Sequence, residues 1–258
     1  MKKTLLEKTA DKLVDAFVNN KIIKPLPTKF TKRLKEAQKL RKLCESKVND
    51  QVIGFKAAGT GIPVMKKLKE KKPFYAAIFK KNFIKSGKKV KINKSTLGIE
   101  LEVCYLIKKN FFSSKGSITM KNVSKHISHM SPCIEVVGYR QKKKGITSFG
   151  DLCSDFGANV KFLIGQKKKY KRINIGNLKT NIANKKIGQS VDGNTNTVYI
   201  NPLNSLRFVL NELKKDKVNL DKDFYVFTGS TVGVVPILGK GLYTGKIDKL
   251  GTAKAIIH

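Results

Sequence analysis

Acidic residues are scarce in this sequence, in which 18 aspartates and glutamates stand against 54 lysines and arginines and the formal net charge is +36. Tryptophan is absent, and the four cysteines form no Cys-x-x-Cys pair. The cysteines lie in apolar contexts, which predicts reduced, buried thiols and argues against a zinc site or a disulfide framework. No run of 18 apolar residues occurs, so we expect no membrane-spanning helix.

The N-terminal residues 1–19 form an amphipathic pattern that contains Glu7, Asp11 and Asp15. A signal peptide instead carries an uninterrupted apolar stretch, so we expect a cytoplasmic protein. With 258 residues, 40% of them hydrophobic, the chain is long enough to bury a sizeable core. We expect an N-terminal helical segment over residues 1–50 and a larger domain over residues 51–258.

The apolar pattern predicts a few helices and many short strands. Apolar residues recur at helical spacing between Leu5 and Phe17 and again over residues 31–47, with a Pro-Leu-Pro break between them. Residues 52–58 read as a strand. Further on, Asn201 is suited to cap a helix that Pro202 begins. The short apolar runs of the remaining chain, separated by Gly, Asn and Lys turns, favour an α+β fold that is mostly β.

The excess of positive charge suggests a polyanion as a possible partner. Only five of the 54 basic residues are arginine, however. Proteins that recognise bases and phosphates usually bind them through the two-pronged guanidinium group of arginine. The lysines are also spread along the whole chain, and no helix-turn-helix, zinc-finger or RNA-recognition pattern accompanies them. We therefore do not expect specific nucleic-acid binding, and a general lysine bias explains the charge equally well.

Because acids are scarce, carboxylates inside apolar runs stand out. Side chains two residues apart on a strand point to the same face, so Glu100 and Glu102 in the run 99–107 are predicted to lie together. A hard divalent cation, Mg²⁺ or Mn²⁺, is the natural partner of such a pair, with Glu135 in the later apolar run as a third ligand. From spacing alone the alternative stays open that both glutamates lie on a solvent-facing strand and pair with lysines.

Six segments in order resemble the fumarylacetoacetate hydrolase superfamily, and within it the group of 2-keto-4-pentenoate hydratases and 4-oxalocrotonate decarboxylases. The resemblance extends from the first helix almost to the last residue. The segments are GFKAAGTG (54–61), IELEVCYLI (99–107), SPCIEVVGYR (131–140), SDFGANVKFLIG (154–165), NPLNSLRFVLNEL (201–213) and FTGSTVGVVPILGKG (227–241).

This resemblance implies a fold and a metal site. The fold is a mixed β-sandwich or roll that follows a small N-terminal helical segment, usually assembled as a homo-oligomer. Glu100, Glu102 and Glu135 match the three carboxylate ligands of the family for Mg²⁺ or Mn²⁺, which favours the metal reading over the solvent-facing strand. A small carboxylate substrate, of the kind met in aromatic catabolism, is the expected partner.

The resemblance also implies roles for residues around the metal. Lys56 matches the active-site lysine of the family, where it would bind the substrate carboxylate or move a proton; without the match it would read as one more surface lysine. Asp155 matches a family Ala-Asp-Asn stretch and is a candidate for substrate binding. Thr228, Gly229 and Ser230 match a loop that closes over the substrate, although a tight structural turn explains them as well.

One departure from the family bears on the reaction. Hydratases of this group carry an aspartate that acts with the lysine as an acid or base, and Phe74 stands at that position here. Because a phenyl ring exchanges no proton, another group takes that step or the reaction differs. We also expect Phe74 to enlarge the apolar part of the pocket.

The sequence thus predicts a metal-dependent lyase that hydrates 2-hydroxypenta-2,4-dienoate or a similar 2-oxo acid through a metal-stabilised enolate. Alternatives are decarboxylation of a 2-oxo diacid, C–C hydrolysis, and a non-catalytic relative that binds polyanions. Hydrolysis has less support, because His126 and His129, which we place on a helix, match no Glu-His motif for activating water.

Overall fold

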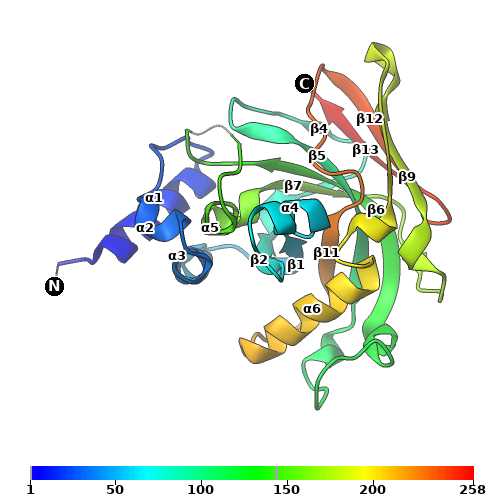
Figure 1. Ribbon diagram of the computed structural model, residues 1–258, viewed down its shortest axis with the longest axis horizontal. Helices are drawn as coiled ribbons and strands as arrows, with labels where there is room; N and C mark the ends of the chain where they lie inside the picture. Colours follow the sequence, from blue (N-terminus) through cyan, green and yellow to red (C-terminus); the bar gives the residue numbers. More distant parts are fainter. Residues whose placement is uncertain (1, 143–144) are drawn as a thin grey trace.

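The computed structural model describes residues 2–142 and 145–258, which form N-terminal helices followed by two β-sheets (Figure 1). This is the α+β, mostly β architecture that the sequence predicts. No helix within the described ranges is long and apolar enough to cross a bilayer. The cysteines at 44, 104, 133 and 153 are buried and free, as predicted.

Three helices lie together at the N-terminal end (Figure 1). α1 (Leu5–Val18) begins with a capping box in which Thr4 and Glu7 satisfy each other's backbone amides. After the proline break come α2 (Thr28–Thr31) and α3 (Leu34–Lys47), so the predicted second helix begins three residues later than expected. Phe17, Phe30 and Leu40 join the same hydrophobic core as the sheets.

The larger sheet carries the site. Its strand order is β2 (Phe74–Phe79), β1 (Val52–Ala58), β11 (Phe224–Ser230), β5 (Thr96–Ile107), β6 (Ile127–Gly138), β7 (Asn159–Ile164) and β3 (Phe83–Lys85), and β8 (Lys168–Lys169) also pairs with β6. Strands β5 and β6 are antiparallel over nearly their whole length. This long central ladder gives the side chains on its two faces fixed relative positions.

The second sheet covers one face of this ladder. Its order is β10 (Gln189–Asn194), β9 (Lys179–Asn184), β12 (Gly241–Ile247), β13 (Gly251–Ile257) and β4 (Lys89–Val90). The sheets meet closely at Gly245, where a Cβ would come within 2.5 Å of Leu101 Cδ1. Since side chains alternate along a strand, Leu101 faces the second sheet, and Glu100 and Glu102 face away from it.

Helices and turns enclose the opposite side. α6 (Pro202–Lys215) begins at Asn201, whose side chain accepts from the Asn204 amide, and packs on β11 (Figure 1). The shorter helices α4 (Ile62–Lys67) and α5 (Phe149–Ser154) were not predicted. Short 3₁₀ segments complete the connections: η1 (Lys80–Asn82), η2 (Lys109–Phe111), η3 (Val123–His126), η4 (Phe156–Ala158), η5 (Ile175–Asn177), η6 (Lys185–Ile187) and η7 (Thr195–Thr197).

The predicted helix that would carry both His126 and His129 is wrong. His126 ends the 3₁₀ segment η3, and His129 lies in strand β6 opposite Leu106 of β5. At His129, pairing of β6 with β5 determines the conformation and overrides the local helical spacing.

Candidate metal centre

The carboxylates of Glu100, Glu102 and Glu135 converge on one face of the β5–β6 ladder. Glu100 lies directly opposite Glu135 in the register, and Glu102 follows two residues further along β5. One oxygen from each of the three lies within 4.8 Å of the others. Glu102 and Glu135 are fully buried, and Glu100 is partly buried. The structure therefore brings together the three acids that the sequence singles out.

Two oxygens of this cluster lack a hydrogen-bond donor among the residues that the structure describes. Glu102 Oε2 accepts from the Gly229 amide at 2.8 Å. Glu102 Oε1 and Glu135 Oε2 are buried and find no hydrogen-bond donor within the described part of the chain. Buried carboxylate oxygens without partners are costly, and Mg²⁺ and Mn²⁺ prefer all-oxygen ligands of this kind. The donor set therefore fits a hard divalent cation.

Lys56 is the cation that the protein itself supplies. Its side chain points from β1 to the cluster, where Nζ lies 2.5 Å from Glu135 Oε1 and 3.2 Å from the Gly157 carbonyl oxygen. The residue is 3% exposed. Burial alone lowers the pKa of Lys56, but the attraction of Glu135 and of the other two glutamates outweighs it, so the pKa is raised. Lys56 thus stays protonated and offsets one of three negative charges.

Protonation of the glutamate carboxyl groups reduces the remaining negative charge. Burial raises the pKa of all three carboxyl groups, and Lys56 opposes that rise. For Glu102, the nearby charge of Glu100 adds to burial and raises the pKa to about 8. A divalent cation would take the place of such protons, so its binding should release protons near neutral pH.

Without metal, we expect the stability of the protein to fall as pH rises from about 5.5 to about 8.5. In this window the folded state keeps a proton on Glu102, whose pKa is about 8, and the unfolded state, with a value near 4.5, has lost it. Stability present at low pH is therefore lost as pH passes through the folded-state pKa. At about 1.4 kcal/mol per pKa unit, the loss amounts to about 2–5 kcal/mol.

Urea unfolding at several pH values in EDTA measures this loss, and saturating Mg²⁺ should abolish it. The Glu102→Gln variant serves as the control, because its neutral amide should remove the contribution of Glu102 to this pH dependence. A metal-free stability that does not change across this window would contradict the raised pKa.

A cavity of about 380 Å³ opens beside Lys56 and Glu100. Its wall is mostly apolar: Ala57, Ala58, Pro63, Val64, Leu97, Val137, Ile146, Leu152, Ala158, Val232 and Val234 all contribute. Besides Lys56 and Glu100, polar side chains on the wall come from Thr60, Asp192, Thr197, Ser230 and Thr231. A small molecule with one polar end at the glutamates and an apolar remainder fits this wall.

Thr228, Gly229 and Ser230 form the last part of strand β11 rather than the predicted loop, and their side chains lie in different positions. Gly229 and Ser230 line the cavity, whereas the Thr228 hydroxyl is buried and donates to the Val103 carbonyl within the sheet. Gly229 has φ of 105°, and a Cβ there would lie 1.9 Å from Thr60 Oγ1. Only glycine allows this close approach, and it lets the Gly229 amide reach Glu102.

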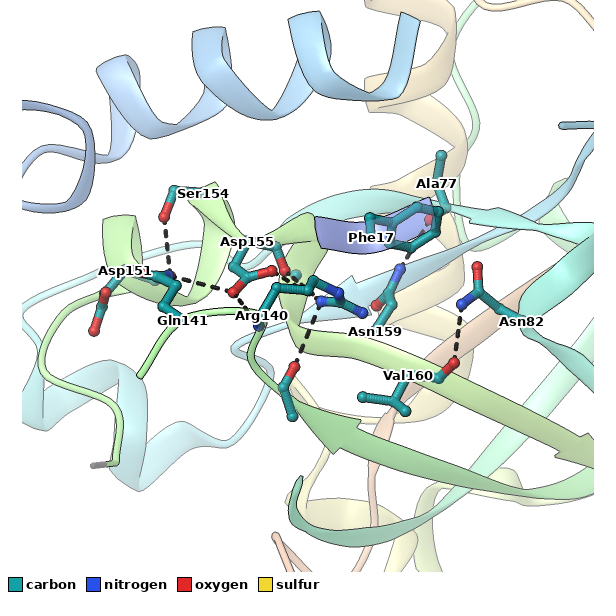
Figure 2. Close-up of polar contacts among 12 residues, drawn as sticks. Phe17, Ala77, Asn82, Arg140, Gln141, Asp151, Ser154, Asp155, Asn159 and Val160 are labelled. Atoms are coloured by element: carbon teal, nitrogen blue, oxygen red, sulfur yellow. Dashed lines mark hydrogen bonds and ion pairs between the residues drawn. The ribbon is translucent and has the colours of Figure 1, made fainter. Parts of the chain in front are cut away.

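Asp155 is buried away from the cavity wall. Its carboxylate accepts from Arg140 Nη1 at 2.9 Å, from the Arg140 amide at 2.7 Å and from Gln141 Nε2 at 3.3 Å (Figure 2). The residue is 0% exposed and is absent from the cavity lining, so both of its oxygens serve protein groups. Substrate contact by Asp155, as predicted from the resemblance, would need this network to open.

Phe74 does not enlarge the cavity as predicted. It is 1% exposed and packs edge-on against Phe149, with ring centroids 5.8 Å apart, beneath the wall. Several lining residues escaped the sequence analysis, among them Thr60, Gly157, Asp192 and Thr197. Gly157 lies inside the segment that resembles the family, and a glycine two residues after Asp155 was an available signal of a turn.

No family model and no curated protein matches the sequence. The 4-oxalocrotonate decarboxylase from Pseudomonas putida G7, solved with magnesium and adipate, superposes with a TM-score of 0.84 over 100% of this chain and 99% of that chain, at 18% sequence identity. The fumarylacetoacetate hydrolase from Exiguobacterium antarcticum gives a TM-score of 0.57 over 81% and 75%, at 12% identity.

A third structure, the 5-carboxymethyl-2-hydroxymuconate delta-isomerase from Mycobacterium smegmatis, gives a TM-score of 0.55 over 81% of this chain and 80% of that chain, at 11% identity. These likenesses establish the fold. The chain has the fumarylacetoacetate hydrolase fold that the sequence resemblance predicts, and its match to the decarboxylase includes the N-terminal helices.

Proposed function

We propose that this protein is a divalent-metal-dependent lyase that hydrates 2-hydroxypenta-2,4-dienoate or a closely similar 2-oxo acid. The observation that carries the proposal is the buried cluster of Glu100, Glu102 and Glu135, in which two oxygens find no donor among the described residues and from which Glu100 reaches the wall of an apolar cavity. A bound Mg²⁺ or Mn²⁺ would stabilise negative charge on the 2-oxo oxygen of the substrate. As the sequence predicts, the enzyme would be cytoplasmic and homo-oligomeric.

Lys56 is the group we propose for proton transfer. An ammonium has three N–H donors, and Lys56 uses two of them on Glu135 and Gly157. The third is available to the cavity, which Lys56 lines. The ammonium can give a proton to a substrate carbon, and the amine that remains can take a proton from the attacking water, without the aspartate that Phe74 replaces. Gly229 and Ser230, on the wall next to Glu102, would contact the substrate carboxylate.

The cavity wall favours a substrate with a single carboxylate. Lys56 is the one basic side chain among the lining residues that the structure describes, and it is already paired with Glu135. Asp192 on the same wall would repel a second carboxylate. The apolar residues elsewhere on the wall suit a hydrocarbon tail and exclude water from the site.

A 2-oxo diacid decarboxylase is the second candidate. It is favoured by the structural likeness to 4-oxalocrotonate decarboxylase, which spans both chains almost completely. Decarboxylation uses the same stabilised enolate as hydration, so the glutamates and Lys56 would keep their places. The length and charge of the substrate tail distinguish the two reactions.

Ultraviolet absorbance of the dienol tests the proposal. With Mg²⁺, we expect turnover of 2-hydroxypenta-2,4-dienoate at least about tenfold more efficient than turnover of dicarboxylic relatives, and no turnover in EDTA. Carbon dioxide release from a diacid would identify the decarboxylase instead. If no substrate turns over and unrelated nucleic acids bind in a salt-sensitive manner, the protein is a polyanion-binding relative and the proposal is wrong.

A further inference from the structure

The turn between α5 and β7 has an unfavourable backbone. Phe156, Gly157 and Ala158 follow one another with φ of 51°, 64° and 59°, in the left-handed region that side chains disfavour. Such conformations persist where the surroundings hold them, and they often belong to functional sites. This turn points the Gly157 carbonyl at Lys56 Nζ, 3.2 Å away, and places Gly157 and Ala158 in the cavity wall.

An ion pair holds the start of this turn. Arg140 Nη1 donates to Asp155 Oδ1 at 2.9 Å and to the Asp155 carbonyl oxygen at 3.2 Å, and that same carbonyl accepts from the Ala158 amide at 2.8 Å (Figure 2). Arg140 therefore contacts both the side chain and the backbone of the residue that precedes the turn. Because the pair is buried, solvent does not weaken it.

Aromatic rings hold the turn from the side of the N-terminal helices. Phe156 stacks on Phe17 of α1, with ring centroids 4.2 Å apart. The Arg140 guanidinium lies 5.2 Å from the Phe17 centroid and 5.6 Å from the Phe156 centroid. Figure 2 shows the Phe17 ring beside the Arg140 side chain. Phe156 is thus held by the stacking of its ring, and Asp155 by the ion pair of its carboxylate.

We propose that Arg140 and Asp155 are positioning residues for Lys56. They hold the left-handed turn, the turn aims the Gly157 carbonyl, and that carbonyl together with Glu135 orients the Lys56 ammonium toward the cavity. Asp155 then acts through the backbone without touching the substrate. The kinetic consequence rests on the proposed function, whereas the orientation of Lys56 does not.

Chemical labelling of lysines tests the orientation without any substrate. In the Mg²⁺-loaded protein, acetic anhydride followed by mass spectrometry should leave Lys56 protected relative to surface lysines. In Asp155→Asn we expect labelling of Lys56 to rise at least tenfold. Glu45→Gln is the matched control, because it removes the carboxylate of another largely buried pair, with Arg41 at 2.6 Å, whose hydrogen bonds go to Arg41 and to the Ala77 amide.

The labelling result decides between positioning and general stability. If Glu45→Gln lowers the melting temperature as much as Asp155→Asn does and exposes Lys56 equally, the pair serves the fold alone and the inference is overturned. If Asp155→Asn does not fold, Arg140→Lys replaces it, since it keeps a cation but loses the fork that reaches the Asp155 carbonyl. A several-fold rise in Lys56 labelling is then expected, and an unchanged value overturns the inference.

A double-mutant cycle tests the kinetic consequence. Asp155→Asn should lower kcat at least tenfold with little change in KM, and should add nothing in a Lys56→Gln background, because both changes remove the same oriented group. Additive effects would overturn a role through Lys56. If the wild-type protein turns over no substrate, the proposed function fails, and the labelling arm still tests the positioning.

Discussion

Replacing Glu102 by glutamine should lower the affinity for Mg²⁺ and Mn²⁺ at least about 100-fold, since loss of even an outer-shell partner of a metal costs 10–100-fold. Turnover should disappear with the metal. Glu102 is the appropriate residue because it is fully buried, has one oxygen free and approaches both other carboxylates. Calorimetric titration of the metal-free protein measures the affinity.

The same substitution should stabilise the metal-free protein at alkaline pH. The glutamine oxygen can still accept from the Gly229 amide, and the neutral amide ends repulsion from Glu100. At pH 8.5 in EDTA we expect a gain of about 2–4 kcal/mol. Glu212→Gln, on helix α6 and paired with Lys215 at the surface, should change neither property. A variant that binds metal normally, or that is destabilised in EDTA, would contradict the account.

Replacing Lys56 by glutamine should lower kcat by about 100- to 10,000-fold, the usual contribution of a positioned acid or base. Metal affinity should stay the same or increase, because the variant lacks the ammonium that competes with a cation for Glu135. The metal-free variant should be less stable by about 3–5 kcal/mol, since removing one partner leaves buried carboxylate charge unpaired. Mg²⁺ should restore most of that loss.

Stopped-flow kinetics and metal titration on the same preparation separate these effects. Lys161→Gln is a suitable control, because that half-buried lysine donates to the Lys81 carbonyl outside the cavity. Loss of metal binding in Lys56→Gln together with loss of turnover would assign Lys56 to the structure of the metal centre and would remove it from proton transfer.

Local patterns were sufficient to place the acids. Strand alternation predicts that Glu100 and Glu102 share a face, and the strand over residues 52–58 and the Asn201-capped helix form as predicted. Each of these features depends on neighbours in the sequence. The apolar run around Glu135 made it a candidate third ligand and the resemblance supported it, but its position opposite Glu100 comes from the pairing of two separate strands.

Local sequence patterns could not predict the contacts between segments that are distant in the sequence. Lys56 meets Glu135 and Gly157 across 79 and 101 residues, so its spacing gives no hint of either contact. The position of Asp155 away from the cavity is similar, because it follows from hydrogen bonds to Arg140 and from the stacking of the neighbouring Phe156 on Phe17. Helix α5 escaped notice because it is only six residues long and owes its place to contacts with α2 and α3.

The central claim is that Glu100, Glu102 and Glu135 hold one divalent cation at the end of the cavity. Crystals of the protein soaked in Mn²⁺ and measured at its absorption edge test this claim most directly. We predict one strong anomalous peak per chain, bounded by oxygens of all three glutamates at about 2.2 Å, and no such peak in Glu102→Gln. A peak elsewhere, or none at these glutamates in saturating Mn²⁺, would contradict the account.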